Sequence, residues 1–362
     1  MDLEERLETI AAVGEEIITR EDLRELLERK EHPIAYDGFE PSGLVALHTG
    51  IFRPLLIKEL LRAGVEFKLL VADWFAWINN KMGGDLGAIS KVGEYFVEAW
   101  AAAGVDMNNV KIVKTSDIVG NKDYWKKVVL ISKNTTLTRM NRCLAIMDRT
   151  EGELKDAAQY LYPAMQCADI FHLGADICQL GLGQRKINML ARELGPKLGY
   201  WKPVVVSHHM LMGLGGPKFE GKFDENKEIN IEISSKMSKS KPSEAIFVHD
   251  STEEIKKKLA KAFCPEKQVE YNPVLDYCKH IIFRAEKTIE IERPEKFGGD
   301  ISFESYAELE EAYRKGRVHP MDLKNATAKY LDKLIAPVRT HFEKNPRAKE
   351  LYEFVKSREM TR

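Results

Sequence analysis

Pro33-Ile34-Ala35-Tyr36-Asp37-Gly38-Phe39 is a short apolar run, and the turn-forming residues Glu40-Pro41-Ser42-Gly43 follow it. This pattern predicts a buried strand that ends in a loop. Helical periodicity then extends from Ile51 to Arg62, and a second buried strand is predicted over residues 67–73. Strand, loop, helix and strand form a βαβ unit, in which the two strands lie parallel.

The same alternation of helices and strands continues to residue 206. The predicted elements are helices over 89–103, 154–173 and 184–194 and strands over 110–113, 175–178 and 203–206. A long helical stretch over 123–149 has no strand partner, so residues 115–150 are interpreted as a helical insertion. The fold class is therefore α/β, a Rossmann-like doubly wound parallel sheet. Such sheets bind ligands at the carboxyl ends of their strands, here in the loops after Tyr36, Asp73 and Cys178.

The segments on either side of this sheet indicate further parts. Residues 1–32 have apolar positions at helical spacing and predict N-terminal helices ahead of a catalytic domain over 33–250. Residues 213–233 are rich in glycine and charge and end in alternating isoleucines, and residues 213–241 are predicted to form a flap followed by a basic loop. Residues 251–362 are predicted to be mostly helical and form the C-terminal domain.

Composition limits the classes of protein to be considered. The chain has 362 residues, of which 44% are hydrophobic and 31% charged, as is typical of a globular protein of two domains. No apolar run approaches the roughly 20 residues of a membrane span. The net charge of −1 supplies no overall field for nucleic acid. Five cysteines without a C-x-x-C pair and an acidic start indicate reduced thiols, a cytoplasmic location and no metal site.

A basic loop is predicted at Ser235-Lys236-Met237-Ser238-Lys239-Ser240, which we call the lysine loop. A lysine ammonium is a compact point charge on a flexible stem, so two of them can follow the charge that develops on the phosphate oxygens of ATP. The pattern therefore indicates an ATP-binding loop. Taken alone, the same residues could also form a solvated basic turn.

Six sequence blocks occur in the order found in one enzyme family. They are Gly38-Phe39-Glu40-Pro41-Ser42-Gly43, Ala72-Asp73-Trp74-Phe75-Ala76, Tyr162-Pro163-Ala164-Met165-Gln166, Gln184-Arg185-Lys186, Lys236 to Ser240, and His319-Pro320-Met321-Asp322-Leu323-Lys324. The chain thus resembles the tyrosyl-tRNA synthetases of the archaeal and eukaryotic type, which are class I aminoacyl-tRNA synthetases. The resemblance covers about residues 33–335 and implies that the helical C-terminal domain binds the anticodon.

This resemblance implies a ligase that works in two steps. ATP activates the carboxylate of L-tyrosine as an adenylate and releases pyrophosphate, and the tyrosyl group then passes to the 3′ end of tRNA(Tyr). By resemblance, Lys236 and Lys239 are catalytic and contact the pyrophosphate. Gly43 and Ser238 are further ATP-binding residues, Gly50 is expected to leave room beside the adenine, and Mg²⁺ would accompany the nucleotide.

The resemblance also assigns a pocket for the amino acid. Tyr36 and Asp169 match the pair that binds the phenol hydroxyl, which favours tyrosine over the indole of a tryptophanyl enzyme. A buried site for a hydroxyl rejects phenylalanine by orders of magnitude, a rule for which tyrosyl enzymes are the standard example. Tyr162, Gln166 and Gln184 match the ammonium-binding residues, and the spacing of Tyr162, Gln166 and Asp169 predicts one polar stripe along a helix. Considered singly, Tyr36 would be a core residue and Asp169 a helix cap.

Contacts with tRNA and with a second subunit are implied in the same way. The insertion over 115–150 corresponds to the connective region of the family, which implies a homodimer, and Arg142 is expected at the first base pair of the tRNA. Phe297 and Asp322 match the anticodon readers. An aromatic ring stacks on an unpaired base, and a carboxylate accepts hydrogen bonds from the edge of guanine.

Three features depart from the family pattern. Gly183 stands where relatives carry an acidic residue, and the flap over 213–233 is longer than usual. The phosphate-binding histidine of the family falls on Ala46 in an ungapped register, or on His48 if the loop is two residues longer. The need for a phosphate donor favours His48 as a catalytic, ATP-binding residue. The altered motif leaves open a tRNA-binding paralogue with impaired activation.

Overall fold

The computed structural model describes residues 1–147, 151–219 and 223–359 of the chain. Residues 148–150 of the predicted insertion and residues 220–222 of the predicted flap lie outside the described residues. In the part that is described, no helix is long and apolar enough to cross a membrane.

The chain folds into two compact units, each built from several segments of the sequence. The sheet unit comprises residues 1–42, 56–95 and 106–209, and the lysine-loop unit comprises residues 43–55, 96–105 and 210 onward.

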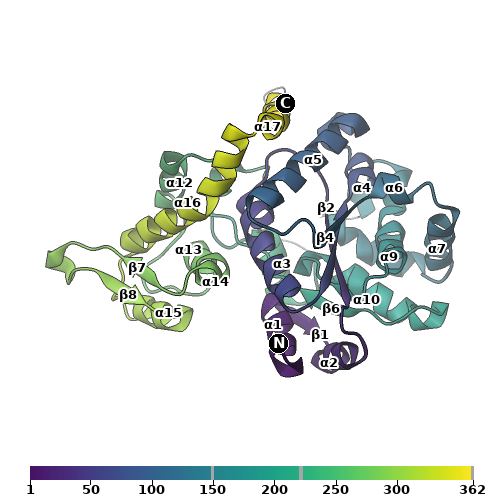
Figure 1. Cartoon of the computed structure of the whole chain (residues 1–362), viewed down its shortest axis with the longest axis horizontal. Helices are drawn as coiled ribbons and strands as arrows, with labels where there is room; N and C mark the ends of the chain where they lie inside the picture. The colour runs from purple at the N-terminus through teal and green to yellow at the C-terminus, as the bar shows by residue number, and fades with distance from the viewer. Residues whose placement is uncertain (148–150, 220–222, 360–362) are drawn as a thin grey trace. The chain divides into compact units, whose positions relative to one another are not determined.

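The sheet unit is organised by one sheet of six strands (Figure 1). In spatial order the strands are β1 (Glu16–Ile18), β6 (Val204–Ser207), β5 (Ile177–Cys178), β2 (Ile34–Phe39), β3 (Glu66–Val71) and β4 (Val110–Lys114). All neighbours pair in parallel except β1, which is antiparallel to β6. The predicted doubly wound α/β fold is confirmed. Strand β1 is not predicted from the sequence, because three residues are too few to show a strand period.

The order of the strands reverses next to β2. The chain adds β3 and β4 on one side of β2 and later places β5 and β6 on the other side. Tyr36 on β2 therefore lies in register with Lys68 of β3 and with Cys178 of β5. Doubly wound sheets bind their ligands at such a switch point, so the fold positions Tyr36 for a site.

Helices surround this sheet. They are α1 (Leu3–Val13), α2 (Arg20–Arg29), α3 (Arg53–Arg62), α4 (Asp73–Ile78), α5 (Leu86–Ala102), α6 (Thr115–Ile118), α7 (Lys122–Lys133), α8 (Leu137–Cys143), α9 (Tyr162–His172) and α10 (Arg185–Leu194). Helices α3 and α5 contribute residues to both units. Helix α7 packs against α9, and Tyr124 and Met165 from these helices share one hydrophobic core with Tyr36.

Two helices differ from the prediction. The stretch predicted as one helix over 123–149 consists of α7, α8 and a 3-10 turn over residues 144–147, because Thr136 interrupts it and its hydroxyl caps α8 by accepting from the Arg139 N–H at 3.2 Å. The helix predicted over 154–173 begins only at Tyr162. Pro163 stands in its first turn, where no N–H is needed.

The segment after β2 winds into a helix earlier than predicted. A π-helical turn over His48–Phe52 runs directly into α3, so the helix does not open at Ile51. The preceding residue Leu47 already has helical dihedral angles, with φ −49° and ψ −43°. His48 therefore lies in the first turn of the helix and not in a loop before it.

The lysine-loop unit is mostly helical beyond residue 226, as predicted for the C-terminal part. Its elements are α11 (Lys227–Ser235), α12 (Thr252–Ala260), α13 (Pro273–Tyr277), α14 (Phe283–Ala285), β7 (Ile289–Ile291), β8 (Ile301–Phe303), α15 (Tyr306–Arg314), α16 (Pro320–Lys344) and α17 (Pro346–Glu359). Helix α11 contains the alternating isoleucines of the predicted flap, where no helix is predicted from the sequence. The side chain of Asn226 caps α11 by accepting from the N–H of Glu228 at 2.9 Å, and this cap stabilises the start of the helix.

Candidate active site

Two buried oxygens in the sheet unit form what we call the hydroxyl clamp: the hydroxyl of Tyr36 and Oδ2 of Asp169. Tyr36 is 1% exposed and Asp169 is 0% exposed, and neither oxygen has a hydrogen-bond partner among the described residues. Oδ1 of Asp169 accepts a hydrogen bond of 3.0 Å from the hydroxyl of Tyr124. Buried polar atoms are normally paired, so two unpaired ones from neighbouring elements indicate a ligand with a polar group.

Burial governs the ionisation of the clamp. It raises the pKa of the Asp169 carboxyl well above its usual value, and the hydrogen bond from Tyr124 opposes that rise. Burial also raises the pKa of Tyr36, and Cys178 and Asp169 beside it add smaller contributions. The clamp therefore favours a neutral polar group, such as a hydroxyl, over a charged one.

The residues of the predicted polar stripe lie on α9, where Gln166 and Tyr162 have different hydrogen-bond partners. Gln166 donates from Nε2 to Oε1 of Gln184 at 2.9 Å, and Gln184 donates to the carbonyl of Ile146 at 3.1 Å. The structure thus brings Gln166 and Gln184 together. Tyr162 instead donates its hydroxyl to Oε1 of Glu40 at 2.8 Å.

Two further polar side chains contact the predicted site residues and are not predicted from the sequence. Tyr124 lies on α7 of the insertion, where its only sequence signal is a tyrosine in an otherwise ordinary helical pattern. Glu40 lies in a quoted sequence block and could have been selected as a carboxylate after a strand. It accepts from Tyr162 and also from Asn79 at 2.6 Å.

The two registers of the phosphate-binding histidine have different surroundings in the lysine-loop unit. Ala46 is fully buried in a short antiparallel bridge with Phe247, flanked by a 2.8 Å hydrogen bond from the Leu47 N–H to the carbonyl of Ile246. His48 is half-buried at the start of the helical turn. Of the two positions, only His48 has a side chain that can donate to a phosphate.

The glycines of this segment have structural reasons of their own. Gly43 has a φ of +57°, which other residues rarely adopt. A Cβ on Gly50 would lie 2.6 Å from a methyl group of Val45 and 2.5 Å from one of Val248. The space beside Gly50 is therefore filled by valines, and this close packing is what requires glycine there.

Backbone contacts fix the start of the lysine loop. Lys236 forms an antiparallel bridge with Met212, and the N–H of Met237 donates to the carbonyl of Leu211 at 2.7 Å. The two lysine side chains are half-buried, and Nζ of Lys239 lies 4.9 Å from the centroid of the Phe96 ring. Ser238 and Ser240 share a hydrogen bond of 2.8 Å.

The residues predicted to contact tRNA lie on three separate elements. Arg142 is exposed in the last turn of α8 in the sheet unit. Asp322 is half-buried in the first turn of α16, and Phe297 ends a 3-10 turn over residues 295–297 in the lysine-loop unit. Gly183 lies in the turn before α10.

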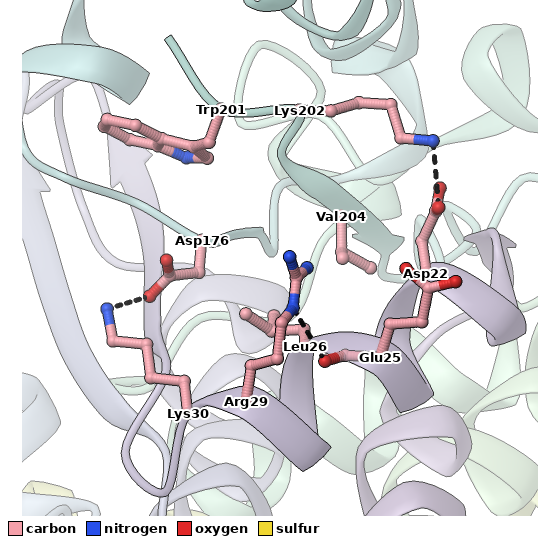
Figure 2. A pocket seen from close by; sticks show the side chains of 9 residues that line it. All are labelled: Asp22, Glu25, Leu26, Arg29, Lys30, Asp176, Trp201, Lys202 and Val204. Atoms are coloured by element: carbon pink, nitrogen blue, oxygen red, sulfur yellow. Dashed lines mark hydrogen bonds and ion pairs between the residues drawn. The ribbon is translucent and has the colours of Figure 1, made fainter.

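A pocket of about 510 Å³ in the sheet unit is not part of this site (Figure 2). It lies between α2 and the amino ends of β5 and β6, away from the carboxyl ends that bind ligands. Ion pairs join Lys30 to Asp176 at 2.6 Å and Lys202 to Asp22 at 2.8 Å across its wall. None of the predicted site residues lines it.

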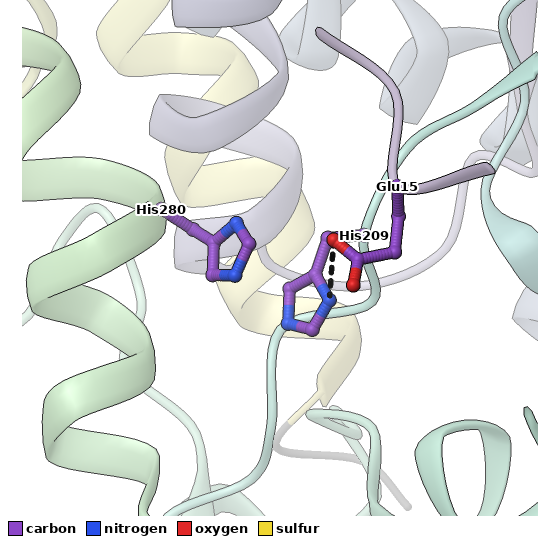
Figure 3. Close-up of side chains that lie close together, drawn as sticks. All are labelled: Glu15, His209 and His280. Atoms are coloured by element: carbon purple, nitrogen blue, oxygen red, sulfur yellow. Dashed lines mark ion pairs between the residues drawn. The ribbon is translucent and has the colours of Figure 1, made fainter. Parts of the chain in front are cut away.

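Two histidines after β6 have carboxylate neighbours within the sheet unit. Nδ1 of His209 lies 3.9 Å from Oε2 of Glu15 (Figure 3). Nε2 of His208 lies 3.6 Å from Oδ2 of Asp37. Each of the two histidines thus lies near a carboxylate of the sheet unit.

Comparisons with known proteins give a consistent result. A family model described as tRNA synthetases class I (W and Y) matches residues 28–234 and 232–336. The chain is 45% identical to the tyrosine–tRNA ligase of Thermococcus sibiricus, with 100% of both covered, and 43% identical to the cytoplasmic tyrosine–tRNA ligase 1 of Arabidopsis thaliana, with 100% of this chain and 90% of that protein covered. The structure of tyrosyl-tRNA synthetase from Pyrococcus horikoshii complexed with L-tyrosine superimposes with a TM-score of 0.89 at 43% identity, covering 98% of this chain and 100% of that chain.

Proposed function

This chain belongs to the class I tRNA synthetases of the tryptophan and tyrosine family, and we infer from that membership that it is a tyrosine–tRNA ligase. It activates L-tyrosine with ATP and transfers the tyrosyl group to tRNA(Tyr). The observation that carries the choice of tyrosine is the hydroxyl clamp, because Tyr36 and Asp169 keep two buried oxygens without partners among the described residues. The hydroxyl of a bound tyrosine would pair with both.

Selectivity follows from the cost of unpaired polar groups. Phenylalanine would leave both oxygens of the clamp unpaired and dehydrated, and an indole has no oxygen to offer Tyr36. Gln166 is hydrogen-bonded to Gln184, which follows the carboxyl end of β5 in the chain, and we assign the ammonium group of the substrate to these two residues and to Tyr162. The hydroxyl of Tyr162 donates to Glu40, and this hydrogen bond keeps the Tyr162 ring in place.

Activation depends on the side chains of the lysine-loop unit. The tyrosine carboxylate attacks the α-phosphorus of ATP, and negative charge increases on the α-phosphate and on the departing pyrophosphate. Lys236, Lys239 and His48 stabilise this charge, because each can place a donor on an oxygen without being consumed. Gly43 and Ser238 also bind the nucleotide. Gly50 allows the turn that begins at His48 to pack closely against Val45 and Val248.

Mg²⁺ would neutralise charge on the triphosphate. Mg²⁺ typically keeps several waters and takes phosphate oxygens as ligands, with at most one or two carboxylates from the protein. The carboxylate that follows the lysine loop is Glu244, and both of its oxygens already have lysine partners. Oε2 lies 3.3 Å from Nζ of Lys218, and Oε1 lies 3.8 Å from Nζ of Lys241. The oxygens of ATP itself are therefore the ligands that fit.

The partners follow from the same proposal. We assign a homodimer interface to the insertion over 115–150, where Val129 and Leu137 are 56% and 79% exposed. Arg142 on the same insertion contacts the acceptor stem, and Phe297 and Asp322 read the anticodon. The cytoplasm is the location that the named Arabidopsis relative supports.

One experiment tests the function. Exchange of radioactive pyrophosphate into ATP is measured with each of the amino acids, followed by charging of tRNA(Tyr). We expect exchange with L-tyrosine and not with phenylalanine or tryptophan. Exchange with tryptophan alone would overturn the substrate, and tRNA binding without any exchange would identify a paralogue that does not activate amino acids.

A further inference from the structure

A short segment of the lysine-loop unit contacts both of the predicted ATP-binding segments. It consists of α13 and the π-helical turn that follows it, residues 273–282. Asn272 caps α13 by accepting from the Val274 N–H at 3.1 Å, and α16 packs against both parts of the segment. The segment is therefore fixed in place, although none of its residues belongs to the predicted site.

The first contact is with the backbone that supports the lysine loop. Oδ2 of Asp276 accepts from the Met212 N–H at 3.0 Å, and the hydroxyl of Tyr277 donates to the Met212 carbonyl at 2.7 Å. Met212 is also the bridge partner of Lys236. Two neighbouring side chains thus hold both backbone groups of the residue that lies beside the first lysine of the loop.

The second contact is with the turn that contains His48. The ring of His280 lies edge-on to the ring of Phe52, with centroids 6.2 Å apart and an interplanar angle of 81°. Phe52 ends the π-helical turn that begins at His48, and both Phe52 and His280 are buried. A change in the position of His280 would therefore be transmitted to the turn.

The two contacts are joined within the segment. Nε2 of His280 lies 3.7 Å from Oδ1 of Asp276, one helical turn away, so Asp276 faces His280 with one oxygen and Met212 with the other. Tyr277 is fully buried, and burial, together with the charge of Asp276, raises the pKa of its hydroxyl well above the usual value. Tyr277 thus keeps its proton and remains a donor.

We propose that Asp276, Tyr277 and His280 are positioning residues for amino-acid activation, which hold the lysine loop through Met212 and the His48 turn through Phe52. This inference rests on the proposed function. The lysines and His48 act on charge that develops over a few ångströms, and a shift of about 1 Å in such groups can lower a rate by about a hundredfold. A rigid attachment outside the site is therefore part of what makes the donors effective.

The sharpest test compares two buried tyrosines. Tyr277 and Tyr313 are both fully buried, and each donates its hydroxyl to a backbone carbonyl, Tyr277 to Met212 at 2.7 Å and Tyr313 to Pro265 at 2.8 Å. We expect Tyr277→Phe to lower the rate constant of tyrosyl-adenylate formation by about tenfold, with tyrosine affinity unchanged. Tyr313→Phe should leave that rate at the wild-type value, because its partner is not next to the lysine loop. Equal rates in the two variants would overturn the proposal.

A second measurement does not depend on activity. Asp276→Ala removes the acceptor of the Met212 N–H, whereas Asp276→Asn keeps an oxygen there. We expect hydrogen exchange at the Met212 amide to become roughly tenfold faster in the alanine variant and to remain near the wild-type rate in the asparagine variant. Adenylate formation should follow the same order. Unchanged exchange at Met212 in Asp276→Ala would show that the contact does not hold this residue.

The outcomes for the two proposals differ. A wild-type protein that catalyses no pyrophosphate exchange with tyrosine would overturn the proposed function and the positioning role with it. An active wild type whose Tyr277→Phe and Asp276→Ala variants are equally active would overturn only the positioning role.

Discussion

The hydroxyl clamp and the lysine loop place polar groups in opposite environments. Tyr36 and Asp169 are almost completely buried on a central strand and a core helix, whereas Lys236 and Lys239 are half-buried on a loop that is fixed by its backbone. A buried and rigid pair can discriminate between substrates, because a wrong ligand leaves it unpaired. Ammonium groups near solvent cost little to keep charged and can follow phosphate charge as it moves. Under the proposed function, this difference separates recognition of the amino acid from its activation, and substitutions should separate them too.

Loss of a lysine should produce the largest effect. We expect Lys239→Ala or Lys236→Ala to lower the rate constant of adenylate formation by about a hundred- to a thousandfold, because each removes a donor to charge in the transition state. Tyrosine affinity should not change. Single-turnover adenylate formation and equilibrium binding of tyrosine measure the two quantities, and Lys241→Ala, just outside the lysine loop, is the control. A parallel loss of tyrosine affinity would break the separation.

His48→Ala tests whether the helical turn belongs with the lysine loop in this comparison. We expect a ten- to a thousandfold lower rate of adenylate formation and little change in tyrosine affinity, because we propose that His48 is the phosphate donor of the altered motif. Pyrophosphate exchange at wild-type rates would assign the motif position to Ala46 and leave activation to the lysines alone.

Substitutions in the hydroxyl clamp should change the selectivity for tyrosine. We expect Asp169→Asn and Tyr36→Phe each to reduce the preference for tyrosine over phenylalanine by about ten- to a hundredfold, since each alters one hydrogen bond to the substrate hydroxyl. The ratio of kcat/KM for the two amino acids in pyrophosphate exchange measures it. The control is Asp123→Asn, because Asp123 is an exposed carboxylate on α7 and is not part of the clamp. Unchanged selectivity in both variants would remove the clamp from the site.

Asp322 lies outside both parts of this comparison and should affect neither. We expect Asp322→Ala to reduce charging of tRNA(Tyr) by about tenfold through loss of a base contact, while adenylate formation stays nearly intact. The two rates are measured on the same preparation. An equal loss in both steps would show that Asp322 supports the start of α16 and not recognition of the anticodon.

The sequence predicts those parts of the molecule in which local chemistry and periodicity agree. The strand that carries Tyr36, the helix that carries Asp169 and the lysine loop all follow from apolar runs and motif residues. The sequence does not predict β1, because it is a strand only through its pairing with β6. The α11 helix is also missed, since alternating isoleucines are typical of strands and only the Asn226 cap favours a helix.

Side-chain partners are the least predictable part of the site. The hydroxyl of Tyr124 reaches Asp169 across 45 residues of sequence, and no periodicity indicates a contact between an insertion and a core helix. The segment that contains Asp276 and Tyr277 is similarly inconspicuous, because its contact with Met212 depends on tertiary packing. Motifs mark the predicted site residues, whereas the side chains that contact and hold those residues become visible only in the fold.

The smallest expected effect is thermodynamic, and it has opposite signs in buried and exposed carboxylates. Burial raises the pKa of Asp169, so between the unfolded pKa and this raised value the folded state binds more protons than the unfolded state. Stability then falls as pH rises through that range, and Asp169→Asn should abolish this loss and raise the free energy of unfolding at neutral pH. The hydrogen bond from Lys127 instead lowers the pKa of Asp123 in the folded state. The stability that Asp123 contributes is therefore present above its unfolded pKa and is lost as the pH falls through its folded pKa. Urea unfolding of both asparagine variants at pH 4, 5.5 and 7 measures the difference. We interpret Asp169 as a residue that provides selectivity and lowers stability at neutral pH. An Asp169→Asn variant that is less stable than the wild type at pH 7 would contradict this interpretation and would make the buried carboxyl a structural group.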